Sequence, residues 1–321
     1  MSEKILIVGA AGQIGSELTE KLRSIYGTYN VIASDINSNN ESLVKSGPFQ
    51  IIDAKNYDEL KNCITGHNIN TVYLMAAMLS ASAEKNPMSA WELNMGSLFH
   101  VLNLAKDGFI NKVFWPSSIA VFGPSTPKVN TPQQTIMEPT TVYGISKLTG
   151  ERWCEYYYQK FGVDVRSLRY PGIISYKTLP GGGTTDYAID IFHKAISEQK
   201  FECFLNAEST LPMMYMDDAI DATIKLMQTN KDAVSLRSSY NLAAISFNPE
   251  ELANSIKKYI PEFEIQYKPD FRQDIANSWP NSIDDSFARN DWNWQYRYNL
   301  DSITKEMING LKATFQNQQP L

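Results

Sequence analysis

Ile5-Leu6-Ile7-Val8-Gly9-Ala10-Ala11-Gly12-Gln13-Ile14-Gly15 is the stretch that decides the fold. Its first four residues form a short apolar run, which is typical of a parallel strand buried on both faces. Ile14, Leu18 and Leu22 then recur at helical spacing and give the following segment one apolar face. The stretch therefore predicts a strand, a glycine-rich turn and a helix, which is the context required for a dinucleotide site.

Each glycine of the turn has a physical role in such a site. Gly9 permits the tight turn, Gly12 lets a pyrophosphate approach the backbone, and Gly15 allows the helix to pack closely on the strand. The first helical residues, Gln13 and Ile14, would present free N–H groups and a favourable dipole to the phosphates. Three glycines alone would also fit a plain turn, but their place between a strand and a helix favours nucleotide binding.

Two acidic residues end the next two strands. Asp35 follows a predicted strand at residues 30–34 and lies about 20 residues beyond the glycines, where the adenosine ribose is held. A carboxylate there repels a 2′-phosphate, and residues 36–40 contain no Arg or Lys, so the pattern favours NAD over NADP. Residues 49–53 predict the third strand, with Asp53 at the carboxyl end where ligands bind. The alternative for Asp35 is a loop aspartate that caps a turn.

The alternation of strand and helix continues along the chain. Further strands are predicted at residues 71–77, 112–115 and 164–170, and one long helix at residues 87–106. This repeated pattern indicates an α/β fold, a Rossmann-type doubly wound parallel sheet.

A change of pattern after residue 175 predicts a second domain. Residues 1–175 are expected to form the NAD-binding Rossmann domain, to which residues 213–245 return. Residues 176–212 and 246–321 are expected to form a smaller C-terminal α/β substrate-binding domain.

Two local features stand out in the second half. Residues 180–186 read Pro-Gly-Gly-Gly-Thr-Thr-Asp and are a candidate lid or substrate clamp, with a plain linker as the alternative. Asp217 or Asp218 is the expected cap of the helix that follows it.

Tyr143 and Lys147 are the strongest candidates for chemistry. They lie four residues apart where a helix should begin, so their side chains share one face. An ammonium group favours a neighbouring phenolate and lowers the pKa of the phenol, which would let Tyr143 accept a proton from an alcohol. Alone, the spacing also fits a surface tyrosine and a solvated lysine. Ser118 follows the strand at residues 112–115 and would lie at the carboxyl edge of the sheet, or would cap a turn.

The composition excludes several other classes of protein. The 321 residues are 43% hydrophobic and 20% charged, with a net charge of -6 and no basic stripe, so nucleic acid is not an expected partner. The three cysteines show no C-x-x-C spacing, and we expect reduced thiols in a cytoplasmic protein. The three histidines are scattered, which argues against a metal site. No apolar run approaches the length of a membrane span.

Taken together and in order, the glycine turn, Asp35, Asp53, Ser118 and the Tyr143-x-x-x-Lys147 pair resemble the extended short-chain dehydrogenase/reductase superfamily. The resemblance covers essentially the whole chain. The segment at residues 117–123, Ser-Ser-Ile-Ala-Val-Phe-Gly, is similar to the catalytic-serine strand of the nucleotide-sugar epimerases. One departure is informative, because Leu211 stands where nucleotide-sugar enzymes carry an Arg that grips the diphosphate.

Three segments, at residues 74–80, 169–175 and 181–188, resemble one branch of the superfamily, the epimerase-like L-threonine 3-dehydrogenases. The resemblance implies NAD-dependent oxidation of the β-hydroxyl of L-threonine to 2-amino-3-ketobutyrate. Tyr143 would be the general base, Lys147 would tune it, and Ser118 would orient the hydroxyl. The expected substrate contacts are Ser80, Ser117, Ser118, Tyr143, Thr185 and Trp279. The expected cofactor contacts are Gly9, Gly12, Gln13, Ile14, Gly15, Asp35, Asp53, Leu74, Ala76, Ala77, Asn94, Tyr143, Lys147, Tyr170 and Ile173.

A homodimer is expected from the same resemblance, through the apolar faces of the helices at residues 88–106 and 143–160. Two alternatives for function stay open. One is a nucleotide-sugar epimerase or dehydratase of the same superfamily. The other is a non-catalytic NAD-sensing protein on this fold.

Overall fold

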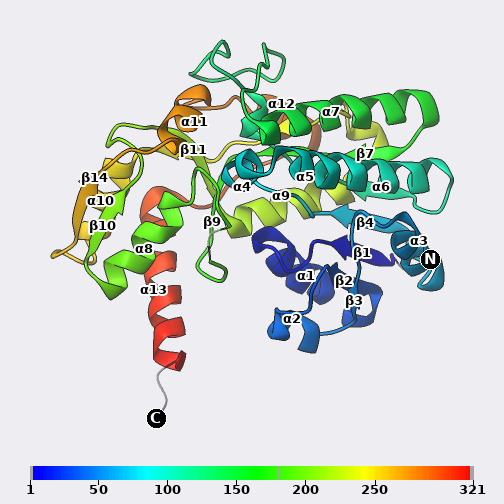
Figure 1. The fold of residues 1–321 in the computed structure, drawn as a ribbon, viewed down its shortest axis with the longest axis horizontal. Coiled ribbons are helices and arrows are strands. Elements are labelled where there is room, and N and C mark those ends of the chain that lie inside the picture. The colour runs from blue at the N-terminus through cyan, green and yellow to red at the C-terminus, as the bar shows by residue number, and fades with distance from the viewer. Residues whose placement is uncertain (1–2, 180, 319–321) are drawn as a thin grey trace.

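The computed structural model describes residues 3–179 and 181–318, so Pro180 of the expected lid lies outside the described residues. Its centre is a six-stranded parallel sheet in the order β3-β2-β1-β4-β5-β7 (Figure 1). The strands are β1 (Ile5–Val8), β2 (Val31–Asp35), β3 (Phe49–Ile51), β4 (Thr71–Leu74), β5 (Lys112–Phe114) and β7 (Asp164–Arg166). The order reverses between β1 and β4, which confirms the expected doubly wound Rossmann-type sheet.

Successive residues of each central strand face opposite layers of helices. Ile5 and Ile7 of β1 belong to one apolar core, whereas Leu6 and Val8 belong to the other. The first layer includes α1 (Gln13–Tyr26) and α9 (Met216–Gln228). The second layer includes α3 (Tyr57–Gly66), α6 (Ser97–Lys106) and α7 (Val142–Phe161). A short helix, α2 (Glu41–Lys45), lies beside α1.

A third apolar core gathers most of its members from the second half of the chain. Two small sheets serve this part: β9 (Gly172–Ile174), β11 (Leu211–Tyr215) and β13 (Ile245–Phe247) form one, and β10 (Lys200–Cys203) pairs with β14 (Glu264–Tyr267) in the other. Its helices are α8 (Tyr187–Ser197), α10 (Pro249–Lys257), α11 (Arg272–Ser278) and α13 (Leu300–Gln318). α12 (Ser286–Trp292) packs instead on β12 (Tyr240–Asn241).

The domain boundaries stay a prediction, although the packing bears on them. α9 packs on α1, and β12 pairs with β8 (Leu168–Tyr170), so both elements adjoin the first half of the chain. Within the described ranges, no helix is long and apolar enough to cross a membrane. Cys63, Cys154 and Cys203 are buried free thiols.

The single strand predicted at residues 164–170 is two strands, so that prediction was wrong. β7 pairs with β5, whereas β8 pairs with β6 (Ser117–Ser118) and β12. Ser167 separates them, and its carbonyl accepts a hydrogen bond from the Tyr240 N–H at 3.0 Å. The ladder therefore changes partners at Ser167, which periodicity along one chain cannot reveal.

The helix predicted at residues 87–106 is interrupted. α5 (Pro87–Trp91) and α6 are joined by a π-helical turn at Glu92–Gly96, with Asn94 at its centre. The insertion of such a turn changes which way a side chain points, and π-turns often occur at functional sites. α5 and α6 follow one another in one row, and α7 runs alongside both of them (Figure 1).

The prediction that Asp217 or Asp218 caps α9 was also wrong. Tyr215 occupies the cap position without a side-chain bond. Asp218 instead accepts hydrogen bonds from the backbone N–H groups of Arg297 and Tyr298, each at 3.1 Å. The carboxylate thus holds a segment about 80 residues away in sequence.

Candidate active site

The N-terminus of α7 positions the tyrosine and lysine pair. Thr141 caps the helix, because its hydroxyl accepts a hydrogen bond from the Gly144 N–H at 3.1 Å. The Val142 N–H donates to the Glu84 carboxylate at 2.8 Å, which adds a favourable negative charge at this end. Tyr143 and Lys147 then follow one turn apart, and Lys147 is only 2% exposed.

Lys147 is buried but well accommodated. Its ammonium nitrogen donates to the Pro116 carbonyl at 2.6 Å and lies 4.6 Å from the centre of the Trp115 ring. Burial lowers the pKa of Lys147 to about 7, although the Cys154 and Glu151 side chains act in the opposite direction. The charge on Lys147 is therefore sensitive to its immediate neighbours.

The pKa of the Tyr143 phenol is shifted in the opposite direction to the one expected from the sequence. Burial raises its pKa to about 12, and a hydrogen bond with Ser118 opposes that shift. The sequence predicted a lowered pKa caused by Lys147, but the ammonium nitrogen lies 5.4 Å from the centre of the Tyr143 ring and is bound to Pro116. Burial outweighs the neighbouring charge in this arrangement.

Two serines of β6 lie beside the pair and have different partners. The Ser118 oxygen accepts a hydrogen bond from the Ala120 N–H at 3.2 Å, and Ser118 also bonds Tyr143. The Ser117 hydroxyl donates to the buried Glu151 carboxylate at 2.6 Å. Ser118 is thus placed to act on a ligand, whereas the Ser117 proton is already engaged.

A cavity of about 220 Å³ brings most of the predicted residues together. The lining includes the residues expected for catalysis and substrate binding, namely Ser80, Ser117, Ser118, Tyr143, Lys147, Thr185 and Trp279. It also includes residues expected to contact the cofactor, namely Gly9, Gly12, Gln13, Ile14, Gly15, Ala77, Tyr170 and Ile173. Asp186 is the only carboxylate among the described residues that line it.

A second hollow of about 350 Å³ shares Gly9, Gly12 and Ala77 with the first. Asp35, Asp53 and Ala76 also line it. The Asp35 carboxylate accepts a hydrogen bond from the Ala11 N–H at 2.9 Å and so ties β2 to the glycine turn. Asp53 accepts one from the Lys55 N–H at 2.9 Å. The two hollows together extend from the acids to Tyr143.

The glycine turn fits a dinucleotide. A Cβ on Gly9, whose φ is +84°, would lie 2.4 Å from the Ala76 nitrogen, and one on Gly15 would lie 2.3 Å from the Gly9 carbonyl oxygen. Only glycine fits at both positions. No side chain caps α1 at Gly12, and the side-chain nitrogen Nε2 of Gln13 is buried without a hydrogen-bond partner. Free donors at a helix N-terminus suit a diphosphate.

Three predicted cofactor residues, Leu74, Asn94 and Tyr170, make contacts within the protein, although Tyr170 also lines the cavity. Leu74 is buried in the core and lines neither hollow. The Asn94 amide bonds both the N–H and the carbonyl of Met78, at 2.8 and 3.2 Å, and so holds the loop after β4. The Tyr170 hydroxyl bonds Thr223. Their contacts with a cofactor stay a prediction.

Residues 183–186 of the expected lid line the cavity together with Ser80 and Trp279. The Asp186 carboxylate accepts hydrogen bonds from the N–H groups of Gly182 and Gly183, at 2.8 and 2.7 Å. The Thr184 and Ser80 hydroxyls are 3.4 Å apart and buried.

Sequence reasoning missed Thr184, Asp186 and Glu151. Thr184 adjoins the predicted Thr185, and loop residues carry no periodic signal. Glu151 had a usable signal, since it follows Lys147 by one further helical turn. Within the described ranges, no group of three or more His, Cys, Asp or Glu residues could hold a metal ion.

Comparisons with known proteins agree with this geometry. Residues 5–243 match the model of the NAD dependent epimerase/dehydratase family. An uncharacterized epimerase/dehydratase from Staphylococcus aureus is 49% identical over 98% of this chain and 99% of its own. The holo form of a GalE-like L-threonine dehydrogenase from Cupriavidus necator superposes with a TM-score of 0.94 at 54% identity, covering 96% of this chain and 99% of that one. A monomeric L-threonine 3-dehydrogenase from a metagenome superposes with a TM-score of 0.93 at 44% identity, covering 97% and 99% of the two chains.

Proposed function

The chain belongs to the NAD dependent epimerase/dehydratase family, and we propose that it oxidises the β-hydroxyl of L-threonine with NAD to give 2-amino-3-ketobutyrate. The observation that carries the proposal is the cavity of about 220 Å³, in which Tyr143, Ser118 and Lys147 face a lid that bears hydroxyl groups. The similar solved structures described as L-threonine dehydrogenases support the same substrate.

NAD is the proposed cofactor. Asp35 lines the hollow next to the glycine turn, and a carboxylate there accepts hydrogen bonds from ribose hydroxyls but repels a 2′-phosphate. Asn37, Asn39 and Asn40, which line an adjoining hollow with Asp35, are uncharged. Lys55 is the cation among the described residues that line the Asp35 hollow, where Asp53 also lies. The cofactor supplies the hydride acceptor when it is bound.

The side chains of the chain itself handle the proton. Ser118 orients the substrate hydroxyl toward Tyr143 and stabilises the developing carbonyl oxygen. Tyr143, as phenolate, takes the hydroxyl proton. Lys147 in its ammonium form stabilises that phenolate and is placed to bond the nicotinamide ribose. The buried surroundings strengthen each of these interactions, because little water screens them.

The substrate side of the cavity suits a small polar molecule. Ser80, Thr184 and Thr185 supply hydroxyl groups, and Trp279, 5% exposed, supplies an apolar wall. A small zwitterion needs several such anchors, and a folded lid excludes water around it.

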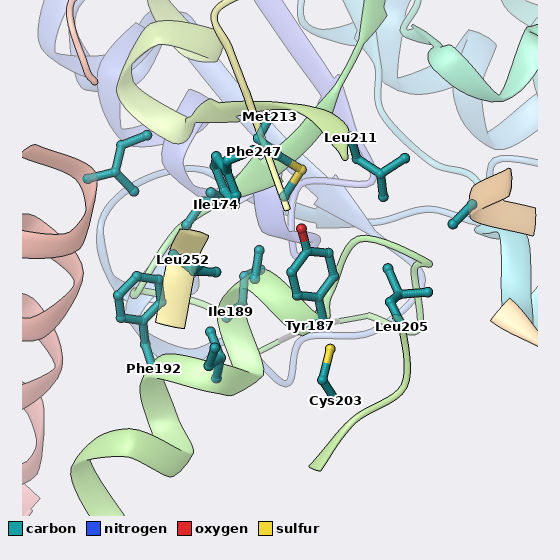
Figure 2. Packing of buried hydrophobic residues seen from close by; sticks show 14 of the residues in the cluster. Ile174, Tyr187, Ile189, Phe192, Cys203, Leu205, Leu211, Met213, Phe247 and Leu252 are labelled. Atoms are coloured by element: carbon teal, nitrogen blue, oxygen red, sulfur yellow. The ribbon is translucent and has the colours of Figure 1, made fainter. Parts of the chain in front are cut away.

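A nucleotide-sugar substrate is the weaker alternative. Leu211, at the position where the resemblance places a diphosphate-binding Arg, is 1% exposed. Figure 2 shows it within the apolar cluster around Tyr187 and Met213. Leu211 itself therefore cannot supply the charged partner that a diphosphate needs. A non-catalytic role is also disfavoured, since the tyrosine, lysine and serine are all retained.

We further propose that the protein acts in the cytoplasm as a homodimer. The buried free thiols suit a reducing compartment. Exposed aromatic and apolar side chains on α5 and α7 supply a surface for a second copy. A similar enzyme is described as monomeric, so the assembly needs its own test.

The substrate proposal is tested by mixing the protein with NAD and following NADH absorbance. L-Threonine should give the strongest signal, with L-serine, 3-hydroxybutyrate and UDP-galactose as comparisons. No signal with threonine and a clear signal with another alcohol would overturn the proposal.

A further inference from the structure

A buried carboxylate behind the site has no place in the proposed mechanism. Glu151 lies on α7 one turn after Lys147, which itself lies one turn after Tyr143, and it is 0% exposed. An unpaired carboxylate so deeply buried would be very costly. Its bonds therefore show what it holds together.

Glu151 joins the helix of the tyrosine and lysine to the strand of the serines. Oε1 accepts hydrogen bonds from the Ser117 hydroxyl at 2.6 Å and from Arg169 Nε at 2.8 Å. Oε2 accepts a second bond from Arg169, from Nη2 at 2.7 Å. Ser117 and Arg169 are partners in the β6–β8 ladder, so one carboxylate bonds both strands at the same level.

Arg169 extends this connection and completes its own hydrogen bonding. Nη1 donates to the Gln133 carbonyl at 3.1 Å and to the Asn241 side chain at 3.0 Å. The guanidinium group is thus held by Glu151 on one side and by β12 and the 124–139 loop on the other. Ser118, the residue after Ser117, is carried by this rigid frame to its position beside Tyr143.

The negative charge of Glu151 also raises the pKa of Lys147. Two side chains of α7 oppose the effect of burial on Lys147, namely Cys154 and Glu151. Burial raises the pKa of the Cys154 thiol far above its usual range, so the thiol is neutral and Glu151 is the anion that matters. Tyr143 is the other titratable side chain of α7 near Lys147. From the other elements, Lys147 contacts the Trp115 ring and the Pro116 carbonyl, and Arg169 of β8 brings a cation into the network through its bonds to Glu151.

We propose that Glu151 is a positioning residue with two effects: it fixes the Ser118 strand against the Tyr143 helix, and it keeps Lys147 in the ammonium form that the phenolate requires. This role rests on the proposed function for its catalytic consequence. Its electrostatic consequence, at Lys147, does not depend on which alcohol is the substrate.

The test is Glu151→Gln, measured as a pH profile with NAD and L-threonine. Loss of the carboxylate charge leaves the Arg169 cation without its counter-charge, so Lys147 and Tyr143 should both lose their protons more readily. We expect kcat to fall about 10-fold or more at every pH, and the acid limb of kcat to move down by roughly one pH unit. A limb that stays in place would overturn the electrostatic half of the proposal.

Asp164→Asn is the matched control. Asp164 is also a buried carboxylate, 8% exposed, and it pairs with Arg166 at 2.9 Å and with Arg237. It lies on β7 and is outside the set of residues that line the cavity. This variant should lose thermal stability as Glu151→Gln does, but its acid limb should not move.

Two further variants separate the halves of the proposal if Glu151→Gln does not fold. Glu151→Asp keeps the charge but shortens the reach, so kcat should fall while the acid limb stays. Ser117→Ala removes only the bond to the strand and should do the same. A wild-type kcat in both variants would overturn the positioning half.

A direct titration distinguishes failure of this inference from failure of the proposed function. The side chain of Lys147 is followed by NMR in lysine-labelled protein, with the signal assigned by its absence in Lys147→Met. Its pKa should be lower in Glu151→Asn or Glu151→Gln than in wild type. An unchanged pKa would refute the inference, whereas lack of threonine turnover in wild type would refute only the substrate.

Discussion

Tyr143 and Lys147 are shifted in opposite directions by one cause, since burial disfavours the charged form of both groups. The neutral pair and the pair made of an ammonium and a phenolate carry the same number of protons. The ratio of these two forms is therefore independent of pH. The population of the active ion pair reaches its maximum once the two groups, taken together, have lost one proton.

This coupling gives the first prediction. The pKa of Lys147 is lowered to about 7 and that of Tyr143 is raised to about 12, so activity should rise with pH through about 7 and then stay level well into the alkaline range. The measurement is kcat/KM for threonine from about pH 6 to about pH 10. A rate that falls as the pH rises above 7 would contradict the coupled pair.

The second prediction concerns the phenol itself. Tyr143→Phe removes the proton acceptor without changing the shape of the cavity, so turnover should fall by roughly 10²- to 10⁴-fold. NAD affinity, measured by calorimetry, should change little. Tyr156→Phe is the control on the same helix, because Tyr156 is 43% exposed and lies outside the cavity lining.

Two side-chain contacts of one short helix join elements that surround the site. α4 (Ser80–Lys85) begins at Ser80, which faces Thr184 of the lid, and its Glu84 bonds the first N–H of α7. One short helix, α4, therefore connects residue Thr184 to the helix that carries Tyr143.

The third prediction belongs to this connection. Glu84→Ala should lower kcat for threonine about 3- to 5-fold, because a hydrogen bond and a favourable charge at the helix N-terminus are lost. Glu84→Gln keeps an acceptor oxygen and should recover most of the rate. Lys85→Ala, the exposed neighbour, is the control. Equal losses in the alanine and glutamine variants would show that Glu84 does not act through this bond.

The elements also show where sequence reasoning succeeds and fails. The strand, turn and helix at residues 5–26 are predictable because local propensity and tertiary packing agree there. The split at Ser167 and the contact of Asp218 with Arg297 depend on partners far away in sequence. No local pattern carries that information.

The same distinction holds for the candidate site. Residues at the carboxyl ends of parallel strands converge by topology, so Gly12, Asp35 and Ser118 could be placed from sequence. The direction of the pKa shift at Tyr143 could not, because it depends on how deeply the helix is buried. Thr184 and the partner of Ser117 likewise follow from loop and helix packing.

At the scale of the whole molecule, an apolar surface runs along α5 and α7. Met88 is 70% exposed, and Trp91 and Trp153 are each 37% exposed. Trp153 also packs edge-on against Phe99 of α6, with ring centres 5.0 Å apart. This is the surface that the proposed homodimer would cover.

The fourth prediction follows from this surface. Sedimentation should find a dimer in wild type, and Trp153→Glu should shift it to monomer by placing a charge in the interface. Tyr29 is 84% exposed and lies outside α5 and α7, so Tyr29→Glu should leave the dimer intact. If the wild-type protein is a monomer at every concentration, the homodimer proposal is wrong.

The central claim, oxidation of threonine at its β-carbon, is tested most directly by isotopic labelling. Threonine carrying deuterium at C3 is mixed with the enzyme and NAD, and the mass of the reduced cofactor is measured, with threonine deuterated at C2 as the control. We predict that NADH gains one deuterium from the C3 label and none from the C2 label. NADH of natural mass from the C3-labelled substrate, or no NADH at all, would contradict the claim.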